Sequence, residues 1–339
     1  MTNIPSLLEE QISISTIESH TAGEPLRVII EGYPVIEGDT ILEKREFVKE
    51  NFDHLRKGLM LEPRGHSDMY GAIITESTTP DGDLGVIFTH NDGYSSMCGH
   101  GVIALTKVVL ETGMLEEKDK IKIDTPAGRV ESIPKLKDGK VEEITFVNVP
   151  SFVYKTNLNI ETHRYGKITF DIAFGGAFYA YLSAKEIGLE IDRKNHDEFV
   201  KAGRKIKQKI KKKFEIEHPY EDDLGFLYGV IFVGPPTNSE NHSSNVCVFA
   251  DGEVDRSPTG TGVSGRAALH HSKGDISENE EIVIESILGT IFKVEIVETT
   301  KYGDFDAVIP KVTGSAHITG KSEFYFDPND PLRYGFKLR

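Results

Sequence analysis

Two short stretches of the chain carry the residue types that could do chemistry. Residues 98–101 place a cysteine before Gly-His-Gly, and residues 259–262 place a threonine before Gly-Thr-Gly. An ionised thiol is a nucleophile and a base near neutral pH. Glycines let a carboxylate approach backbone amides closely, because no Cβ stands in its way. The two stretches therefore predict two anion-binding turns that hold one small carboxylate between them.

The local sequence positions the first turn before a helix. Residues 84–88 form an apolar, strand-like run, and residues 102–110 have apolar residues at helical spacing and end near Gly113. We therefore expect Cys98 at or just before a helix N-terminus. Unpaired amides and the helix dipole favour negative charge there, so the thiol is expected to ionise more easily.

The two stretches belong to a longer repeat. Thr259 lies 161 positions after Cys98, the stretches align without a gap at that offset, and Gly113 falls on Gly274. Such agreement over a long segment indicates an internal duplication of one supersecondary unit. The length of 339 residues is enough for two domains with separate cores, which agrees with the duplication.

The duplication divides the chain into segments. We expect an N-terminal half at residues 12–160, a C-terminal half at residues 166–312, and a tail at residues 313–339 that packs back on a domain. Residues 1–11 are expected to be a short leader. The polar segment 155–166 is expected to cross between the halves.

Composition limits the partners and the compartment. The formal charge of −15 argues against nucleic acid or an anionic membrane as the main partner. Two cysteines make no disulfide framework, no apolar run has the length to cross a bilayer, and the opening residues lack the pattern of a signal peptide. We therefore expect a cytoplasmic protein. The basic run 201–214 is interpreted as an amphipathic helix with a solvated lysine face, with a nucleic-acid patch as the alternative.

Two polar residues near the turns have open roles. Because His100 follows Cys98 by two positions at a helix start, its side chain is expected to point away from the thiol. It would then position the substrate or lie on the surface. Asp255 is either a turn residue or the group that binds a substrate ammonium or ring amine.

Other candidates are set aside on pattern. Cys247 lies in an apolar strand pattern and is expected to be core. Residues 260–265 spell G-x-G-x-x-G with Glu285 beyond them, but the dinucleotide fingerprint needs a strand running directly into the first glycine, and Pro258 intervenes. No histidine has a partner at metal-ligand spacing. The residues therefore predict neither a cofactor nor a metal.

The sequence resembles the proline racemase family along nearly its whole length. The matching motifs are His20-Thr21-Ala22-Gly23-Glu24-Pro25, Arg64-Gly65-His66, Met97-Cys98-Gly99-His100-Gly101, Gly175-Gly176-Ala177-Phe178-Tyr179-Ala180 and Asp255-Arg256-Ser257-Pro258-Thr259-Gly260-Thr261-Gly262. The resemblance implies an α/β fold of mixed α+β character like that of diaminopimelate epimerase. Its two pseudo-symmetric domains would close over an active site in the cleft between them, without pyridoxal phosphate, nucleotide or metal.

The chain departs from the racemases and epimerases of this family at one position. Those enzymes carry a cysteine in both signatures, whereas this chain has Cys98 in the first and Thr259 in the second. An unperturbed aliphatic hydroxyl ionises far too weakly to replace a thiol as the second base. The Cys/Thr pair resembles that of the trans-3-hydroxy-L-proline dehydratases.

The resemblance also implies roles for the site residues. Cys98 would take the α-proton and Asp255 would hold the ring nitrogen. The backbone amides that would hold the carboxylate belong to Gly99, His100, Gly260 and Thr261. The expected binding partner is a small imino acid. A homodimer is the expected assembly. The alternatives are racemase or hydroxyproline epimerase activity, or a non-catalytic imino-acid-binding protein.

Overall fold

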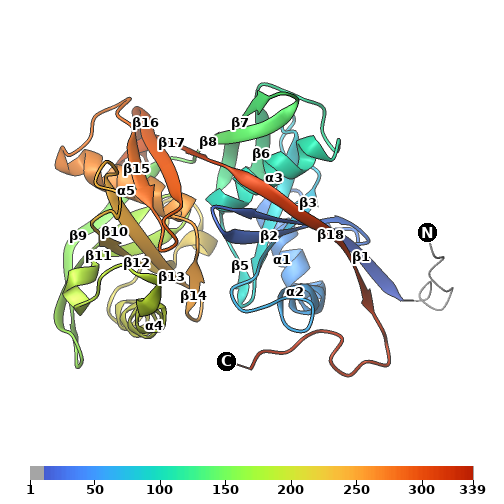
Figure 1. Ribbon diagram of the computed structural model, residues 1–339, viewed down its shortest axis with the longest axis horizontal. Coiled ribbons are helices and arrows are strands. Elements are labelled where there is room, and N and C mark those ends of the chain that lie inside the picture. The colour runs from blue at the N-terminus through green and yellow to red at the C-terminus, as the bar shows by residue number, and fades with distance from the viewer. Residues whose placement is uncertain (1–10, 339) are drawn as a thin grey trace.

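The computed structural model describes residues 11–338 and shows two halves of similar build, each with a helix enclosed by strands (Figure 1). The first half contains β1 (Ile12–Thr21), β2 (Glu24–Glu31), α1 (Ile41–Asn51), α2 (Asp53–Met60), β3 (Tyr70–Thr75), β4 (Leu84–His90), β5 (Gly93–Tyr94), α3 (Gly99–Glu111), β6 (Ile121–Thr125), β7 (Gly128–Lys137) and β8 (Lys140–Val147). The rest comprises β9 (Ser151–Thr162), β10 (Gly166–Phe174), β11 (Phe178–Ser183), α4 (His196–Lys213), β12 (Leu227–Gly234), β13 (Ser243–Phe249), β14 (Glu253–Asp255), α5 (Gly260–Lys273), β15 (Ile282–Glu285), β16 (Ile291–Tyr302), β17 (Phe305–Gly314) and β18 (Ala316–Phe326). The predicted α/β class with two similar halves is confirmed.

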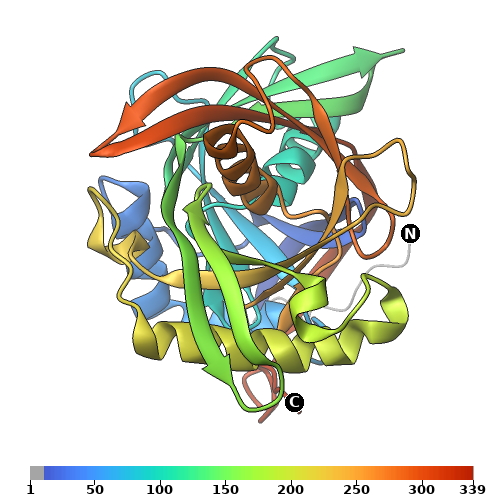
Figure 2. The same ribbon diagram turned by 90° about the vertical axis from the view of Figure 1, so that its left-hand side faces the viewer.

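The strands of the second half close into a barrel. Their pairings run β9–β10–β11–β12–β13–β15–β16–β17 and return from β17 to β9. Helix α5 lies inside this ring, as the end-on view shows (Figure 2). Residues 260–269 of α5 are buried on every side, as expected of a helix enclosed by strands.

The first half repeats this plan around α3. Its pairings run β18–β1–β2–β3–β4–β6–β7–β8, and most residues of α3 are buried. Matching strands also pair alike, since β4 with β6 and β13 with β15 are both parallel. Asp124 and Glu285, which are related by the offset of the repeat, each accept two backbone N–H groups from the loop beside them. The duplication therefore extends to the hydrogen bonds that fix the loops.

The chain passes between the halves differently from the prediction. Residues 155–166 were expected to cross, but they form the end of β9 and its turn into β10, and these two strands pair antiparallel. Most β9 side chains between residues 155 and 162 are exposed or half-buried, so the segment lacks the apolar alternation that marks a strand. Strand β9 pairs with β10 and β17, although the sequence placed residues up to 160 in the first half.

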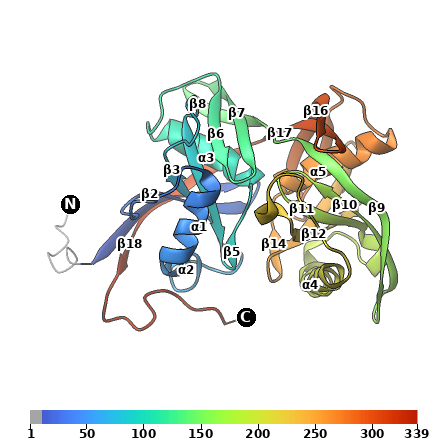
Figure 3. The same ribbon diagram turned by 180° about the vertical axis from the view of Figure 1, so that it is seen from behind.

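The C-terminal segment returns to the first half. Strand β17 pairs with β8, and β18 then runs antiparallel to β1. The segment formed by β17 and β18 therefore crosses from the second half to the first, as the front and back views show (Figures 1 and 3). The leader expected at residues 1–11 lies, up to residue 10, outside the described residues. Helix α4 is amphipathic as predicted, with Phe199, Ile206 and Ile210 buried. Among residues 11–338, no helix is both long and apolar enough to cross a membrane.

The central helices meet head to head at two glycines. Gly99 and Gly260 are the first residues of α3 and α5. A Cβ added to Gly99 would lie 2.5 Å from the Cα of Gly260, and one added to Gly260 would lie 2.6 Å from the Cα of Gly99. Only glycine at both positions lets the two N-termini approach this closely.

Substituting either glycine should separate the halves. We expect Gly99→Ala and Gly260→Ala to lower the free energy of unfolding by about 1–3 kcal/mol, as overpacking does elsewhere. Denaturant unfolding measures this loss. Gly93→Ala is the matched control, because a Cβ at Gly93 meets no atom within 4 Å. Equal stability of all three variants would contradict the head-to-head constraint.

Candidate active site

Cys98 caps the first central helix with its sulfur. Its backbone is extended, with φ −144° and ψ 107°, and its Sγ accepts the N–H of Gly101 at 3.2 Å. The side chain is buried, with a relative exposure of 4 %. The position at a helix N-terminus agrees with the sequence analysis.

The expectation that His100 points away from Cys98 is wrong. The Nδ1 of His100 lies 3.2 Å from the Cys98 Sγ. The rule that residues two apart on a helix diverge applies inside a helix. Cys98 precedes the helix in an extended conformation, so its side chain folds back over the first turn. Burial lowers the pKa of His100 to about 3, and the Pro25 carbonyl opposes this shift, so the ring is neutral.

The expectation that the Cys98 thiol ionises more easily is wrong for this structure. Burial raises its pKa well above the usual value, whereas the N–H of Gly101 and the hydroxyl of Tyr70 lower it. The negative charges of Asp255 and Glu24 raise it further. The helix start acts in the predicted direction, but loss of hydration outweighs it. An ammonium group bound against Asp255 would offset the charge of that carboxylate and so lower the pKa of the thiol.

Thr259 occupies the equivalent position in strained form. Its φ of 68° lies in the left-handed region, which a β-branched residue rarely adopts. The residue is buried, and its Oγ1 forms no hydrogen bond of standard geometry among residues 11–338. The hydroxyl nevertheless stabilises the ionised forms of Asp255 and Cys247, since it lowers the pKa of both groups. Thr259 therefore presents a hydroxyl beside these two residues where Cys98 presents sulfur.

Asp255 is the acidic group of the site. It lies on β14, and its Oδ1 accepts the N–H of Ser257 at 2.7 Å. Burial raises its pKa to about 6, against the opposing bonds from Ser257. Next to it, Arg256 donates its backbone N–H to buried Glu24 at 2.7 Å and its guanidinium to the carbonyl of Asp68 at 2.9 Å. These bonds fasten β14 to the first half.

The predicted site residues line one small cavity. Its walls comprise Tyr70, Met97, Cys98, Gly99, His100, Tyr179, Tyr228, Cys247, Phe249, Asp255, Thr259, Gly260 and Thr261. The cavity measures about 20 Å³, which is room for roughly one water molecule. A ligand larger than a water molecule does not fit in this space, so the two halves are closed over the cavity.

Sequence reasoning missed the tyrosines and the place of Cys247 in this wall. Cys247 is buried, as expected of a core residue, but it also lines the cavity. Tyr179 bonds the Oγ1 of Thr261 at 2.7 Å, and Tyr70 bonds across the halves to Tyr228 at 3.2 Å. No spacing in the chain signals these contacts. Only the motif that contains Tyr179 was singled out.

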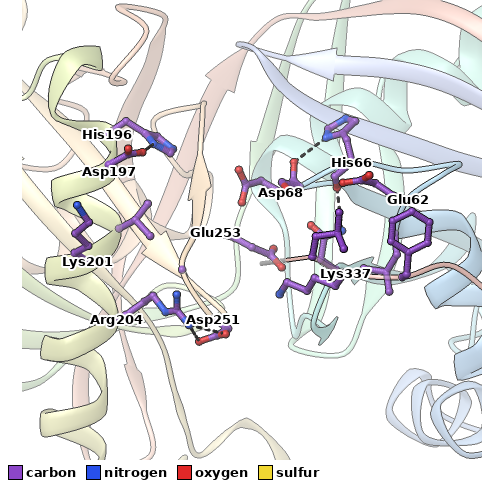
Figure 4. A pocket seen from close by; sticks show the side chains of 17 residues that line it. Glu62, His66, Asp68, His196, Asp197, Lys201, Arg204, Asp251, Glu253 and Lys337 are labelled. Atoms are coloured by element: carbon purple, nitrogen blue, oxygen red, sulfur yellow. Dashed lines mark hydrogen bonds and ion pairs between the residues drawn. The ribbon is translucent and has the colours of Figure 1, made fainter.

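A larger cleft lies outside this cavity, between the halves. It has a volume of about 260 Å³ and is lined by charged residues from both sides, among them Asp68, Lys201, Arg204 and Lys337 (Figure 4). Strand β14 links the two spaces, because Glu253 lines the cleft and Asp255, two residues on, lines the cavity. Within residues 11–338, no group of three or more His, Cys, Asp or Glu is arranged to hold a metal ion.

Known proteins resemble this chain over most of its length. The family model "Proline racemase" matches residues 16–337. A trans-3-hydroxy-L-proline dehydratase of Colwellia psychrerythraea is 50% identical over 98% of this chain and 94% of its own. A proline racemase of Clostridioides difficile is 44% identical over 96% of this chain and 98% of its own. A crystal structure of a hydroxyproline epimerase from Agrobacterium vitis with bound trans-4-hydroxy-L-proline superposes with a TM-score of 0.92, at 30% identity, over 96% of this chain and 95% of its own.

The raised pKa of Asp255 should make the free energy of unfolding depend on pH. An unfolded aspartate titrates near pH 3.9, so the folded protein loses stability as pH rises from about 4 to about 6, by roughly 3 kcal/mol for a shift of about two units. We expect Asp255→Asn to raise the unfolding midpoint at pH 8 and to lose this advantage at pH 4. Thermal unfolding at both pH values tests this. Asp251→Asn, at an exposed carboxylate, is the control, and equal gains at both pH values would contradict the prediction.

Proposed function

The chain belongs to the proline racemase family, and we propose that it dehydrates trans-3-hydroxy-L-proline to Δ1-pyrroline-2-carboxylate. It is a hydro-lyase that uses no cofactor. The observation that carries this proposal is the asymmetry of the closed cavity. Cys98 caps one central helix with a thiol, and Thr259 stands at the same place on the other with an alcohol. The name of the relative that is 50% identical supports the same activity.

The second thiol of the cavity does not restore the symmetry. Cys247 lies on β13 and is not a helix cap. Burial raises its pKa well above the usual value and the charge of Asp255 raises it further, whereas the Thr259 hydroxyl and the charge of Lys207 lower it. Cys98 differs in its position at a helix N-terminus, where its Sγ accepts the N–H of Gly101. We therefore assign removal of the substrate's α-proton to Cys98 alone.

The mechanism begins with capture of the zwitterion. The amides of the first turns of α3 and α5 receive the carboxylate, where both helix dipoles favour negative charge. The ring ammonium lies against Asp255, whose charge it offsets, and this lowers the pKa of the Cys98 thiol. The thiolate then removes the α-proton. The amides stabilise the enolate-like charge, water leaves from C3, and the enamine tautomerises to the cyclic imine.

The remaining assignments follow from the same chemistry. We place the enzyme in the cytoplasm, because both cysteines are free and a reducing compartment keeps Cys98 reactive. Its partner is a small imino acid rather than nucleic acid or membrane, in keeping with the net charge of −15. A homodimer remains our proposal for the assembly.

Replacing Cys98 should abolish the reaction. We expect Cys98→Ser to lower kcat/KM for trans-3-hydroxy-L-proline by about 10³-fold or more, because a hydroxyl is a far weaker base. Formation of the ketimine product measures the rate. Cys247→Ser is the matched control and should keep most of the activity. Comparable losses in both variants would remove the distinction between the two thiols.

Replacing Thr259 tests the alternative activity, racemisation or epimerisation. The name of the racemase relative suggests this alternative. Thr259→Cys supplies a second thiol at a helix start, so we expect slow interconversion of L- and D-proline or epimerisation of trans-4-hydroxy-L-proline. Chiral chromatography measures the products. Rapid inversion by the unaltered protein would show that elimination is not its main reaction.

A further inference from the structure

The stereochemistry of the proposed substrate decides where a proton donor must stand. In trans-3-hydroxy-L-proline the carboxylate and the hydroxyl lie on opposite faces of the ring. The α-hydrogen and the hydroxyl therefore lie on the same face. The base that removes the hydrogen and the acid that protonates the leaving hydroxyl must approach from the same side. This inference rests on the proposed function.

The side of the cavity that carries Cys98 also carries one tyrosine of the first half. Tyr70 lies on β3, lines the same cavity, and is buried, with a relative exposure of 3 %. Its ring packs edge-on against His100 at 4.7 Å between centroids, and His100 in turn contacts the Cys98 sulfur. The Tyr70 hydroxyl also interacts with the Cys98 thiol.

Hydroxyl groups from both halves hold Tyr70 in place. Its hydroxyl is hydrogen-bonded to the Oγ of Ser95, which is 2.7 Å from the hydroxyl of Tyr228 in the other half. The two tyrosine hydroxyls are 3.2 Å apart. If Tyr228 donates to Ser95 and Ser95 donates to Tyr70, the proton of Tyr70 lies in the 3.2 Å contact with Tyr228, from which a leaving hydroxyl in the cavity would take it. The arrangement exists only when the halves are closed.

Most other polar groups of the wall already have a partner: His100 contacts the Cys98 sulfur, and Thr259 stands at the start of the second central helix. The amides at the helix starts take the carboxylate, Asp255 takes the ring nitrogen, and Cys98 takes the α-proton. Tyr179 is bonded to Thr261 of the second half. The 3-hydroxyl is the one polar group of the substrate without a partner, and Tyr70 is the hydroxyl on the required side.

We propose that Tyr70 is the general acid of the dehydration, with Ser95 and Tyr228 as its positioning residues. The Cys98 thiolate takes the α-proton and becomes a thiol. The C3–O bond breaks, and Tyr70 gives its proton to the departing oxygen, which leaves as water. The thiol then returns a proton to the Tyr70 oxygen. Both residues are restored in one turnover, and the only net change is loss of water from the substrate.

The chemistry of tyrosine suits this role. Burial raises the pKa of Tyr70 above its ordinary value of about 10, so the hydroxyl is fully protonated at neutral pH. The same hydroxyl would also favour substrates that carry a hydroxyl at C3 on the Cys98 side.

Tyr70→Phe in the full-length protein tests the proposal. We expect dehydration of trans-3-hydroxy-L-proline to fall by about 10²–10⁴-fold, the range for loss of a general acid. Exchange of the α-hydrogen with D₂O should persist, so the ratio of exchange to elimination rises. Proton NMR of the recovered substrate and a ketimine assay measure the two rates. Dehydration within about threefold of the unaltered protein, or equal loss of exchange and elimination, would overturn the assignment.

A substrate with a leaving group that needs no proton provides the second readout. Tyr70→Phe should eliminate chloride from trans-3-chloro-L-proline at nearly the rate of the unaltered protein, and failure of this rescue would contradict the role of an acid. Tyr179→Phe is the matched control, because it removes a buried cavity hydroxyl bonded to the second half and should not raise the ratio of exchange to elimination. If the unaltered protein forms no ketimine from trans-3-hydroxy-L-proline, the proposed function itself fails, independently of Tyr70.

Discussion

The architecture depends on the head-to-head contact of two helices at Gly99 and Gly260. Two positive dipole ends that face each other repel, and only the surrounding barrels keep them in place. The repulsion becomes useful when an anion lies between them. Each barrel fixes one helix by burying it on nearly every side, so the distance between the two starts is set by the closure of the halves rather than by local flexibility.

Cys98 and Thr259 occupy the same position in the two copies of the repeat but differ in side chain and in backbone conformation. The backbone plan is repeated, down to the carboxylates that tie corresponding loops, yet Cys98 adopts an ordinary extended conformation and Thr259 a strained one. Strain held in a buried position requires the surroundings to enforce it. In the proposed mechanism, the two faces of a bound ring therefore meet different chemistry. One face would meet the Cys98 sulfur and the Tyr70 hydroxyl, and the other the Thr259 hydroxyl.

The sequence predicted the parts of the site that are local. The repeat located both central helices, and the helix rules placed Cys98 at a cap. The sequence could not predict the contact of His100 with the Cys98 sulfur. The direction of the Cys98 side chain depends on the backbone angles of this capping residue, and residue spacing does not reveal those angles. Tyr70 and Tyr228 meet only through folding, since 158 positions separate them. Strand β9 was missed because its exposed side chains hide the alternation on which strand prediction relies.

The return of β18 to β1 has a consequence for how the protein is made. The ribosome releases the first half early, but the edge of its sheet stays open until residues 316–326 have been translated, after the whole second half. Until then the nascent chain carries β1 without its β18 partner, and such an edge is the kind of surface that other chains join. A chain that stops before residue 316 therefore leaves the first half without one of its strands.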